Sequence, residues 1–243
     1  NAKPTLWMAG DSIMQSYAPG DKPVTGWGEM LHTLAQGDAV CCAAHRADCP
    51  FPQEMRYELP GLVIDNCAMA GRSSKTFREE GRLDDIAAHI RPGDLLVVSF
   101  GHNDANRAKA ERYVPADAFG ESLRPFWDAA RSHGAVCIFA SPVAMREFDE
   151  DSVCHPSFAA YREAMRAFAA EVGAPFIDLG AATAAANTAL GAERCKARYM
   201  WVGAKQDNAH QQNAGACRTA QAFVQQLLQD TTPALDVLRA SFK

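Results

Sequence analysis

This 243-residue sequence predicts an α/β fold built on a parallel five-stranded sheet. Two observations indicate it: short apolar runs bounded by turn residues, typical of strands covered on both faces, and helix-length segments that separate these runs. Strands that alternate with helices favour parallel strands joined by right-handed crossovers. The predicted strands are Thr5–Ala9, Leu62–Asn66, Asp94–Phe100, Ala135–Ala140 and Pro175–Leu179.

Helical patterns fill most of the intervals between these strands. Arg91-Pro92-Gly93 ends one of them, and Gly134 is suited to cap another at its C-terminus. The stretch 38–61 has no clear period and contains three cysteines and three prolines. We expect an irregular loop there, either bordering a site or without a role. The predicted helices are Gly26–Gln36, Leu83–Ile90, Asp117–His133, Pro156–Val172 and Gln211–Leu228.

Composition places the chain among ordinary globular proteins. The net charge is −5, and no run of Lys or Arg predicts a nucleic-acid surface. Apolar stretches have the length of strands, so none is long enough to span a bilayer. Without a repeat or a linker, residues 1–243 are expected to form a single domain; the oligomeric state cannot be inferred from the sequence.

The eight cysteines are irregularly spaced, which in a chain of this size favours free thiols and a reducing compartment. We therefore expect a bacterial cytoplasmic location. Secretion stays open, because the chain starts at Asn1 without a methionine and a removed leader would leave no trace. A metal site at Cys41, Cys42, His45 and Cys49 is the less favoured alternative, since no second ligand pair follows at zinc-site spacing. No metal or cofactor is expected.

Small and polar residues follow three predicted strands, where functional groups of parallel sheets gather. Gly10-Asp11-Ser12 follows the first strand, Gly71 lies after the second, and Gly101-His102-Asn103-Asp104 follows the third. Ser12 is the candidate nucleophile of an ester hydrolase. The backbone N–H groups of Ser12, at the start of a helix, and of Gly71, with the Asn103 amide, are candidate donors to the oxyanion of a tetrahedral intermediate.

Asp207-Asn208-Ala209-His210 supplies the remaining groups of a hydrolytic triad. The three-residue spacing lets the carboxylate of Asp207 reach one nitrogen of His210, which leaves the other nitrogen for Ser12. Asp207 then fixes the imidazole tautomer, and His210 acts as the base that takes the Ser12 proton.

Four blocks in this order resemble those of the SGNH, or GDSL-like, hydrolase superfamily: Gly10-Asp11-Ser12, Gly71, Gly101-His102-Asn103-Asp104 and Asp207-Asn208-Ala209-His210. The resemblance covers residues 5–228. It implies a flavodoxin-like three-layer α/β/α sandwich. It also implies Ser12, His210 and Asp207 as catalytic residues and Ser12, Gly71 and Asn103 as the oxyanion hole.

Further segments resemble the rhamnogalacturonan acetylesterase branch, carbohydrate esterase family twelve. These segments are Gln15-Ser16-Tyr17, Gly26-Trp27-Gly28, Gly71-Arg72-Ser73-Ser74-Lys75-Thr76-Phe77, Glu80-Gly81-Arg82-Leu83, Pro92-Gly93-Asp94 and Asn213-Ala214-Gly215-Ala216. The resemblance implies a metal-independent serine esterase that removes acetyl groups from plant cell-wall saccharides of the pectin type, with xylan as a further possibility. Two alternatives stay open: a lysophospholipase or thioesterase using the same triad, and an inactive saccharide-binding domain.

Three residues near the blocks are candidate contacts to an acetylated oligosaccharide or polysaccharide. Trp201 has an apolar face on which a sugar ring could stack, or it packs beneath the catalytic loop. His102 either lines the site or only supports it. Arg72 pairs with a substrate carboxylate or with an acid of the protein.

Overall fold

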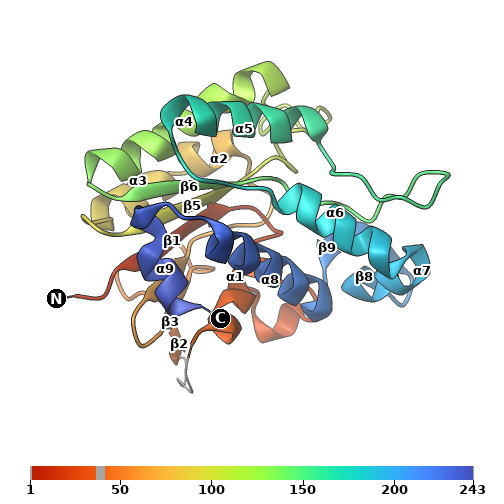
Figure 1. Cartoon of the computed structure of the whole chain (residues 1–243), viewed down its shortest axis with the longest axis horizontal. Coiled ribbons are helices and arrows are strands. Elements are labelled where there is room, and N and C mark those ends of the chain that lie inside the picture. The colour runs from red at the N-terminus through yellow and green to blue at the C-terminus, as the bar shows by residue number, and fades with distance from the viewer. Residues whose placement is uncertain (1, 37–41, 243) are drawn as a thin grey trace.

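A mixed sheet of seven strands forms the centre of the computed structural model, which describes residues 2–36 and 42–242 (Figure 1). Across the sheet the strands follow the order β2-β3-β4-β1-β5-β6-β7. Their bounds are β1 Thr5–Gly10, β2 Cys42–Ala44, β3 Met55–Glu58, β4 Val63–Asn66, β5 Leu95–Ser99, β6 Val136–Ala140 and β7 Phe176–Ile177.

The five strands from β4 to β7 are parallel, as predicted. Leu6 in the central strand β1 lies beside Ile64 of β4 and Leu95 of β5. In chain order these five strands are arranged second, first, third, fourth and fifth, the order of flavodoxin-like sheets. The predicted α/β class and parallel sheet are therefore confirmed.

The expectation of an irregular loop over 38–61 is wrong at two short strands, β2 and β3, whereas 45–54 is irregular as expected. β2 and β3 extend the sheet as an antiparallel edge, with Tyr57 opposite Ala43 on one side and Ile64 on the other. Tyr57 is buried, whereas its neighbours in β3 are only half-buried. Met55 and Tyr57 alternate with Arg56 and Glu58, which is the period of a half-buried strand. This signal covers only four residues, and the pairing with β4 determines the conformation.

Helices cover both faces of the sheet, which confirms the three-layer sandwich (Figure 1). Neither α2 nor α6 was predicted, and the helix expected over Gly26–Gln36 is a single turn, α1, followed by a 3-10 turn. One layer contains α2 Ser74–Glu79, α3 Arg82–His89, α4 Ala116–Ser132 and α5 Ala159–Val172. The other contains α1 Trp27–Met30, α6 Leu179–Leu190, α8 Asn213–Gln229 and α9 Asp236–Ser241.

Alternation along β1 divides the apolar residues into two cores. Leu6 and Met8 pack in the core on the side of α8, and Trp7 and Ala9 in the core on the side of α4. All six residues of β1 are buried. Burial on both faces explains why this strand is continuously apolar rather than alternating.

A separate antiparallel hairpin, β8 Tyr199–Val202 and β9 Lys205–Gln211, lies beyond the sheet next to α7 Ala192–Cys195 (Figure 1). The strands β1, β5 and β6 run towards this side of the molecule. Gln211, predicted to begin a helix, is instead the last residue of β9, and α8 begins two residues later.

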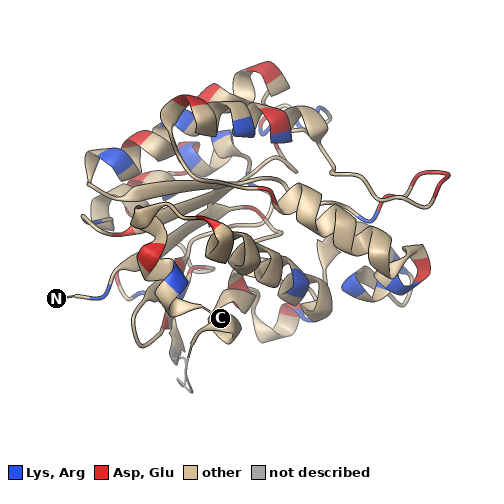
Figure 2. Ribbon diagram, in the orientation of Figure 1, with Lys and Arg blue, Asp and Glu red and all other residues tan. Residues whose placement is uncertain are grey.

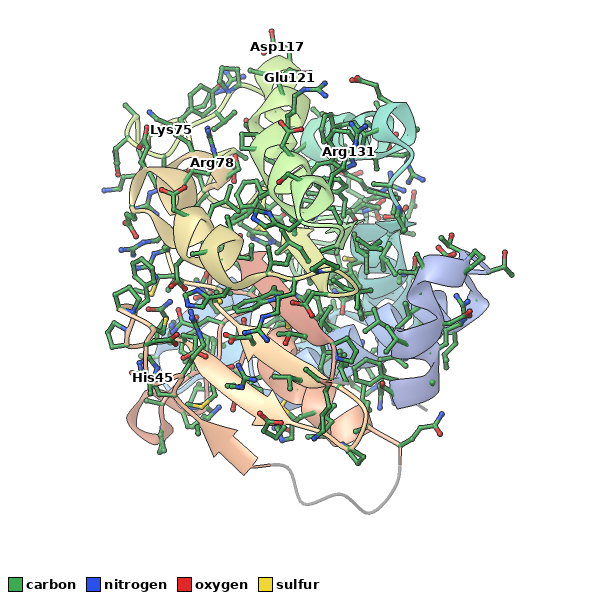
Figure 3. The ribbon with its side chains drawn as sticks, turned by 90° about the vertical axis from the view of Figure 1, so that its left-hand side faces the viewer. His45, Lys75, Arg78, Asp117, Glu121 and Arg131 are labelled. Atoms are coloured by element: carbon green, nitrogen blue, oxygen red, sulfur yellow. The ribbon has the colours of Figure 1, made fainter. Side chains whose placement is uncertain are left out.

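Acidic and basic residues are mixed over the helices (Figure 2). Lys75 and Arg78 on α2 and Asp117 and Glu121 on α4 carry both signs on one side of the molecule (Figure 3). This mixture agrees with the absence of a basic stripe in the sequence. Within the described ranges, no helix is both long and apolar enough to cross a membrane.

Candidate active site

Ser12 lies in a tight turn at the carboxyl end of β1. The backbone N–H groups of Met14 and Gln15 both donate to the Asp11 carbonyl at 3.1 Å, which closes one helix-like turn. The chain does not continue as a helix after it, contrary to prediction. Gly10 precedes this turn, and its backbone lies very close to Met14 and Ser99. A Cβ atom there would lie 2.8 Å from Met14 Sδ and 2.9 Å from the Ser99 carbonyl oxygen.

Ser12, His210 and Asp207 form a continuous hydrogen-bonded series. Ser12 Oγ lies 2.9 Å from His210 Nε2, and His210 Nδ1 lies 2.8 Å from Asp207 Oδ2. The other carboxylate oxygen, Oδ1, accepts the backbone N–H groups of Ala209 and His210 at 2.8 and 3.0 Å. A carboxylate on Nδ1 keeps the proton there, which leaves Nε2 free to accept the Ser12 proton.

The chain after Ser12 holds β9 in place. Trp27 donates its backbone N–H to the Ile13 carbonyl at 2.9 Å, and Thr25 donates to the Gln211 carbonyl at 2.9 Å. These two bonds join the nucleophile turn to the end of the strand that carries His210. Two segments separated by 198 residues in sequence thereby meet at hydrogen-bond distance.

Asn208 fixes the other side of the hairpin. Its backbone carbonyl accepts from Arg146 N at 2.8 Å, and its Oδ1 accepts from Trp201 Nε1 at 2.9 Å. The Trp201 ring has two cationic neighbours, with the Arg146 guanidinium 4.7 Å and Lys196 Nζ 4.8 Å from its centroid. Trp201, in β8, thus bonds to β9 within the catalytic hairpin, and its contact with a sugar stays a prediction.

The carboxylate of Asp207 is adapted to its charged form. Burial, the largest influence, would raise its pKa, but the two backbone N–H groups and the His210 ring together lower the pKa below its usual value. Lys205 adds a further cation, with Nζ 3.5 Å from Asp207 Oδ2. An ionised Asp207 is what an imidazolium on His210 requires.

Each of the three candidate oxyanion donors, Ser12, Gly71 and Asn103, has an N–H without an acceptor among the described residues. Among the residues that the structure describes, none accepts a hydrogen bond from the backbone N–H of Ser12 or of Gly71. Gly71 has a φ of +79°, which is unfavourable for residues with a Cβ. Asn103 uses one N–H of its amide to donate to the Arg72 carbonyl at 3.0 Å, which leaves the second N–H for an oxyanion.

Buried hydrogen bonds hold the two loops that carry Gly71 and Asn103. Ala70 N donates to Gln15 Oε1 at 2.6 Å. Asp104 accepts from Ser74 N at 2.9 Å and from Gly101 N at 3.1 Å, and so joins the third block to the start of α2. Burial nevertheless raises the pKa of Asp104 to about 6.

The His102 ring is uncharged and bonded to the backbone, and its contact with a saccharide stays a prediction. Its Nε2 lies 2.9 Å from the Val143 carbonyl, and its ring contacts Phe158 edge-on at 4.7 Å. Burial lowers the pKa of His102 to about 4, although the bond to Val143 acts in the opposite direction. At neutral pH the proton therefore lies on Nε2, because a carbonyl can only accept.

Arg72 has an acid of the protein as its partner. Its Nε lies 2.9 Å from Glu80 Oε1, and its Nη1 donates to the Ala70 carbonyl at 2.8 Å. A contact between Arg72 and a substrate carboxylate stays a prediction. Arg112, which the sequence did not single out, donates from Nη1 to Asn103 Oδ1 at 2.9 Å. Only the folding of its loop reveals that contact.

The alternative metal site has no support in the described ranges. No group of three or more His, Cys, Asp or Glu side chains there is arranged to hold a metal ion. Cys49 is a free thiol, and the His45 ring nitrogens lie 2.8 Å from Glu54 Oε2 and 3.3 Å from the Cys49 carbonyl oxygen. Cys41 and the side chain of Cys42 lie outside the described residues.

A cavity of about 640 Å³ lies at the opposite ends of the strands. Thr5 and Val63, which begin β1 and β4, line it together with Trp7, Arg46 and Asp94. No residue of the four blocks borders this cavity, so its size does not make it the catalytic site.

Comparisons with known proteins identify the family of the chain. Residues 8–198 match the model of the GDSL-like Lipase/Acylhydrolase family. The chain is 33% identical to rhamnogalacturonan acetylesterase RhgT of Bacillus subtilis (strain 168), over 88% of this chain and 85% of the relative. It is 34% identical to the probable rhamnogalacturonan acetylesterase YesY of the same organism, over 87% and 86%.

Solved structures share the fold. The protein YxiM of Bacillus subtilis superposes with a TM-score of 0.77 at 26% identity, covering 96% of this chain but only 58% of that one. The acetylxylan esterase Axe2 of Geobacillus stearothermophilus has a TM-score of 0.63 at 18% identity, covering 91% and 93%. The family match and the two acetylesterase relatives show that this chain belongs to the GDSL-like lipase/acylhydrolase (SGNH) family and is a carboxylic ester hydrolase.

Proposed function

We propose that this chain removes O-acetyl groups from pectic saccharides of the rhamnogalacturonan type. The observation that carries the proposal is the hydrogen-bonded series from Ser12 to Asp207 in a chain with two acetylesterase relatives at 33% and 34% identity. Those relatives are named for rhamnogalacturonan, and they match over most of both chains.

In the first half of the proposed reaction, Ser12 Oγ attacks the carbonyl carbon of the acetyl group while its proton moves to His210 Nε2. The tetrahedral oxyanion accepts from the N–H groups of Ser12 and Gly71 and from the Asn103 amide. Collapse of the intermediate breaks the bond to the sugar oxygen, which takes the proton from His210. The products are a free sugar hydroxyl and acetylated Ser12.

In the second half, His210 takes a proton from water as that water attacks the acetyl group on Ser12. A second oxyanion forms in the same position, and its collapse returns the proton to Ser12 Oγ and releases acetate. Asp207 stabilises the imidazolium of His210 in both halves. Neither step requires a metal or a cofactor.

The test is acetate release from acetylated rhamnogalacturonan, xylan and mannan oligosaccharides, with Ser12→Ala as the matched inactive protein. We expect release from rhamnogalacturonan fragments, and a fall in kcat of at least about 10⁴-fold in the variant, because removal of one triad member costs nearly as much as removal of all three. Release from xylan or mannan alone would refute the proposed polymer. Undiminished release by Ser12→Ala would refute the nucleophile.

Nitrophenyl esters of increasing chain length separate this proposal from the lipase or thioesterase alternative. An acetylesterase cleaves the acetate much faster than the octanoate. A preference for the octanoate would instead favour a long-chain acylhydrolase. Binding of acetylated fragments without turnover would indicate an inactive saccharide-binding domain.

A further inference from the structure

Arg112 lies against two components of the oxyanion site. Its Nη1 donates to Asn103 Oδ1 at 2.9 Å, and the same atom lies 3.6 Å from the position that a Cβ on Gly71 would occupy. The guanidinium group therefore sits between the loop that carries Gly71 and the turn that carries Asn103.

The amide of Asn103 is useful to an oxyanion only in one orientation. As it stands, Nδ2 donates to the Arg72 carbonyl at 3.0 Å and Oδ1 accepts from Arg112. A half-turn of the amide would place Oδ1 against the Arg72 carbonyl and Nδ2 against the N–H groups of Arg112. Both contacts would then be repulsive, because each would pair two acceptors or two donors.

Backbone hydrogen bonds fix the segment that carries Arg112. Its backbone N–H donates to the Lys109 carbonyl at 3.0 Å, and Val114 N donates to the Asp104 carbonyl at 3.0 Å. The loop therefore returns to the turn that contains Asn103. About a quarter of the Arg112 side chain is exposed, and Glu111 Oε1 lies 3.5 Å from its Nε.

We propose that Arg112 is a positioning residue for acyl transfer: it holds the Asn103 amide so that an N–H, and not the carbonyl oxygen, faces the oxyanion. This role concerns the oxyanion, which forms with any acyl ester, and so it does not depend on the identity of the saccharide. Arginine suits the task because its planar guanidinium group stays charged and cannot accept a hydrogen bond.

A double-mutant cycle on p-nitrophenyl acetate tests the proposal. We expect Asn103→Ala to lower kcat by about 10²–10³-fold, the usual effect of losing one oxyanion donor. Arg112→Met should lower kcat by about tenfold or more while KM changes much less, since the lost interaction acts in the transition state. The double variant should be no slower than Asn103→Ala, to within about threefold.

If the two losses multiply in the double variant, Arg112 acts independently of Asn103 and the proposal is wrong. It is equally wrong if Arg112→Met retains the wild-type kcat. Nitrophenyl acetate carries no sugar, so these outcomes do not depend on whether the natural substrate is a pectic saccharide.

Two further variants complete the experiment. Arg107→Met removes an exposed arginine of the same loop, whose guanidinium lies 5.9 Å from the Tyr113 ring centroid, and should keep the wild-type kcat. Arg112→Lys retains a positive donor and should recover part of the kcat, but only while Asn103 is present. If Arg112→Met fails to fold, as judged by thermal melting, the same cycle is run with Arg112→Lys, and multiplied losses would again overturn the proposal.

Discussion

The carboxyl group of Asp11 is enclosed by protein next to the nucleophile, and this burial raises its pKa to about 7. Its Oδ1 accepts the Ile13 N–H at 2.9 Å, which lowers the pKa but does not outweigh the burial. Between about pH 4 and 7 the folded protein holds a proton at Asp11 that the unfolded chain has released. Stability from this group is therefore greatest at low pH and declines as the pH rises towards 7.

Asp11→Asn should flatten this pH dependence. From pH 5 to pH 8 the wild type should lose on the order of 2 kcal/mol of unfolding free energy through Asp11, and the variant should not. Urea unfolding at both pH values measures the difference. Asp117→Asn, at an exposed position in α4, is the control and should behave like the wild type. If the unfolding free energy of Asp11→Asn fell between pH 5 and pH 8 as much as that of the wild type, Asp11 would already be ionised at pH 5.

Some residues of the site can be predicted from local sequence patterns, and others cannot. Ser12 and Asn103 directly follow apolar strands, and Asp207 and His210 lie three residues apart, so short-range patterns are sufficient to find them. Arg112 lies in a loop without such a pattern. Its contact with Asn103 arises because the loop turns back on itself, which no local periodicity encodes.

The β8–β9 hairpin carries two of the three triad residues, Asp207 and His210, and sequence patterns did not predict it. β9 is polar almost throughout, and six of its seven residues are exposed or half-buried. Hydrophobic alternation, the usual signal of a strand, is therefore missing. α6 was missed for the opposite reason, since small apolar residues lie around much of its surface and give no one-sided pattern.

Gly215, in the first turn of α8, lies against the backbone just before this hairpin. A Cβ there would lie 2.2 Å from the Arg198 carbonyl oxygen, just before β8. Gly215→Ala should therefore shift the base of the hairpin, with a loss of about 1–3 kcal/mol in unfolding free energy and a lower kcat on nitrophenyl acetate. Helix propensity alone predicts the opposite sign for stability, because alanine is the better helix former.

Gly61→Ala is the matched control, because the nearest atom to its added Cβ would be Ser241 Oγ at 3.9 Å. Its unfolding curve and kcat should match those of the wild type. If Gly215→Ala were as stable and as active as this control, the close approach between α8 and Arg198 would not constrain the hairpin.

In the whole molecule, the catalytic groups come from the two ends of the chain, and the sheet and its helices bring them together. The parallel core of the sheet could be predicted because each strand is apolar along its length and is followed by turn residues. The antiparallel edge could not, since β2 and β3 are short and partly exposed and are defined by their pairing with β4. The same holds for the meeting of Ser12 and His210, which we expect to depend on α8 packing against α1 in the core that β1 shares.

Phe223 tests that dependence. Its side chain is fully buried on α8, 5.1 Å from the Trp27 ring and in the same core as Leu6 and Met8. Phe223→Ala should cost about 3–5 kcal/mol of unfolding free energy, whereas Leu228→Ala, at an exposed position of the same helix, should cost less than about 0.5 kcal/mol. In urea, activity and tryptophan fluorescence should be lost together, at a lower concentration for Phe223→Ala. Loss of activity well before the fluorescence change would instead show that the catalytic hairpin separates from Ser12 while the rest of the sheet is still folded.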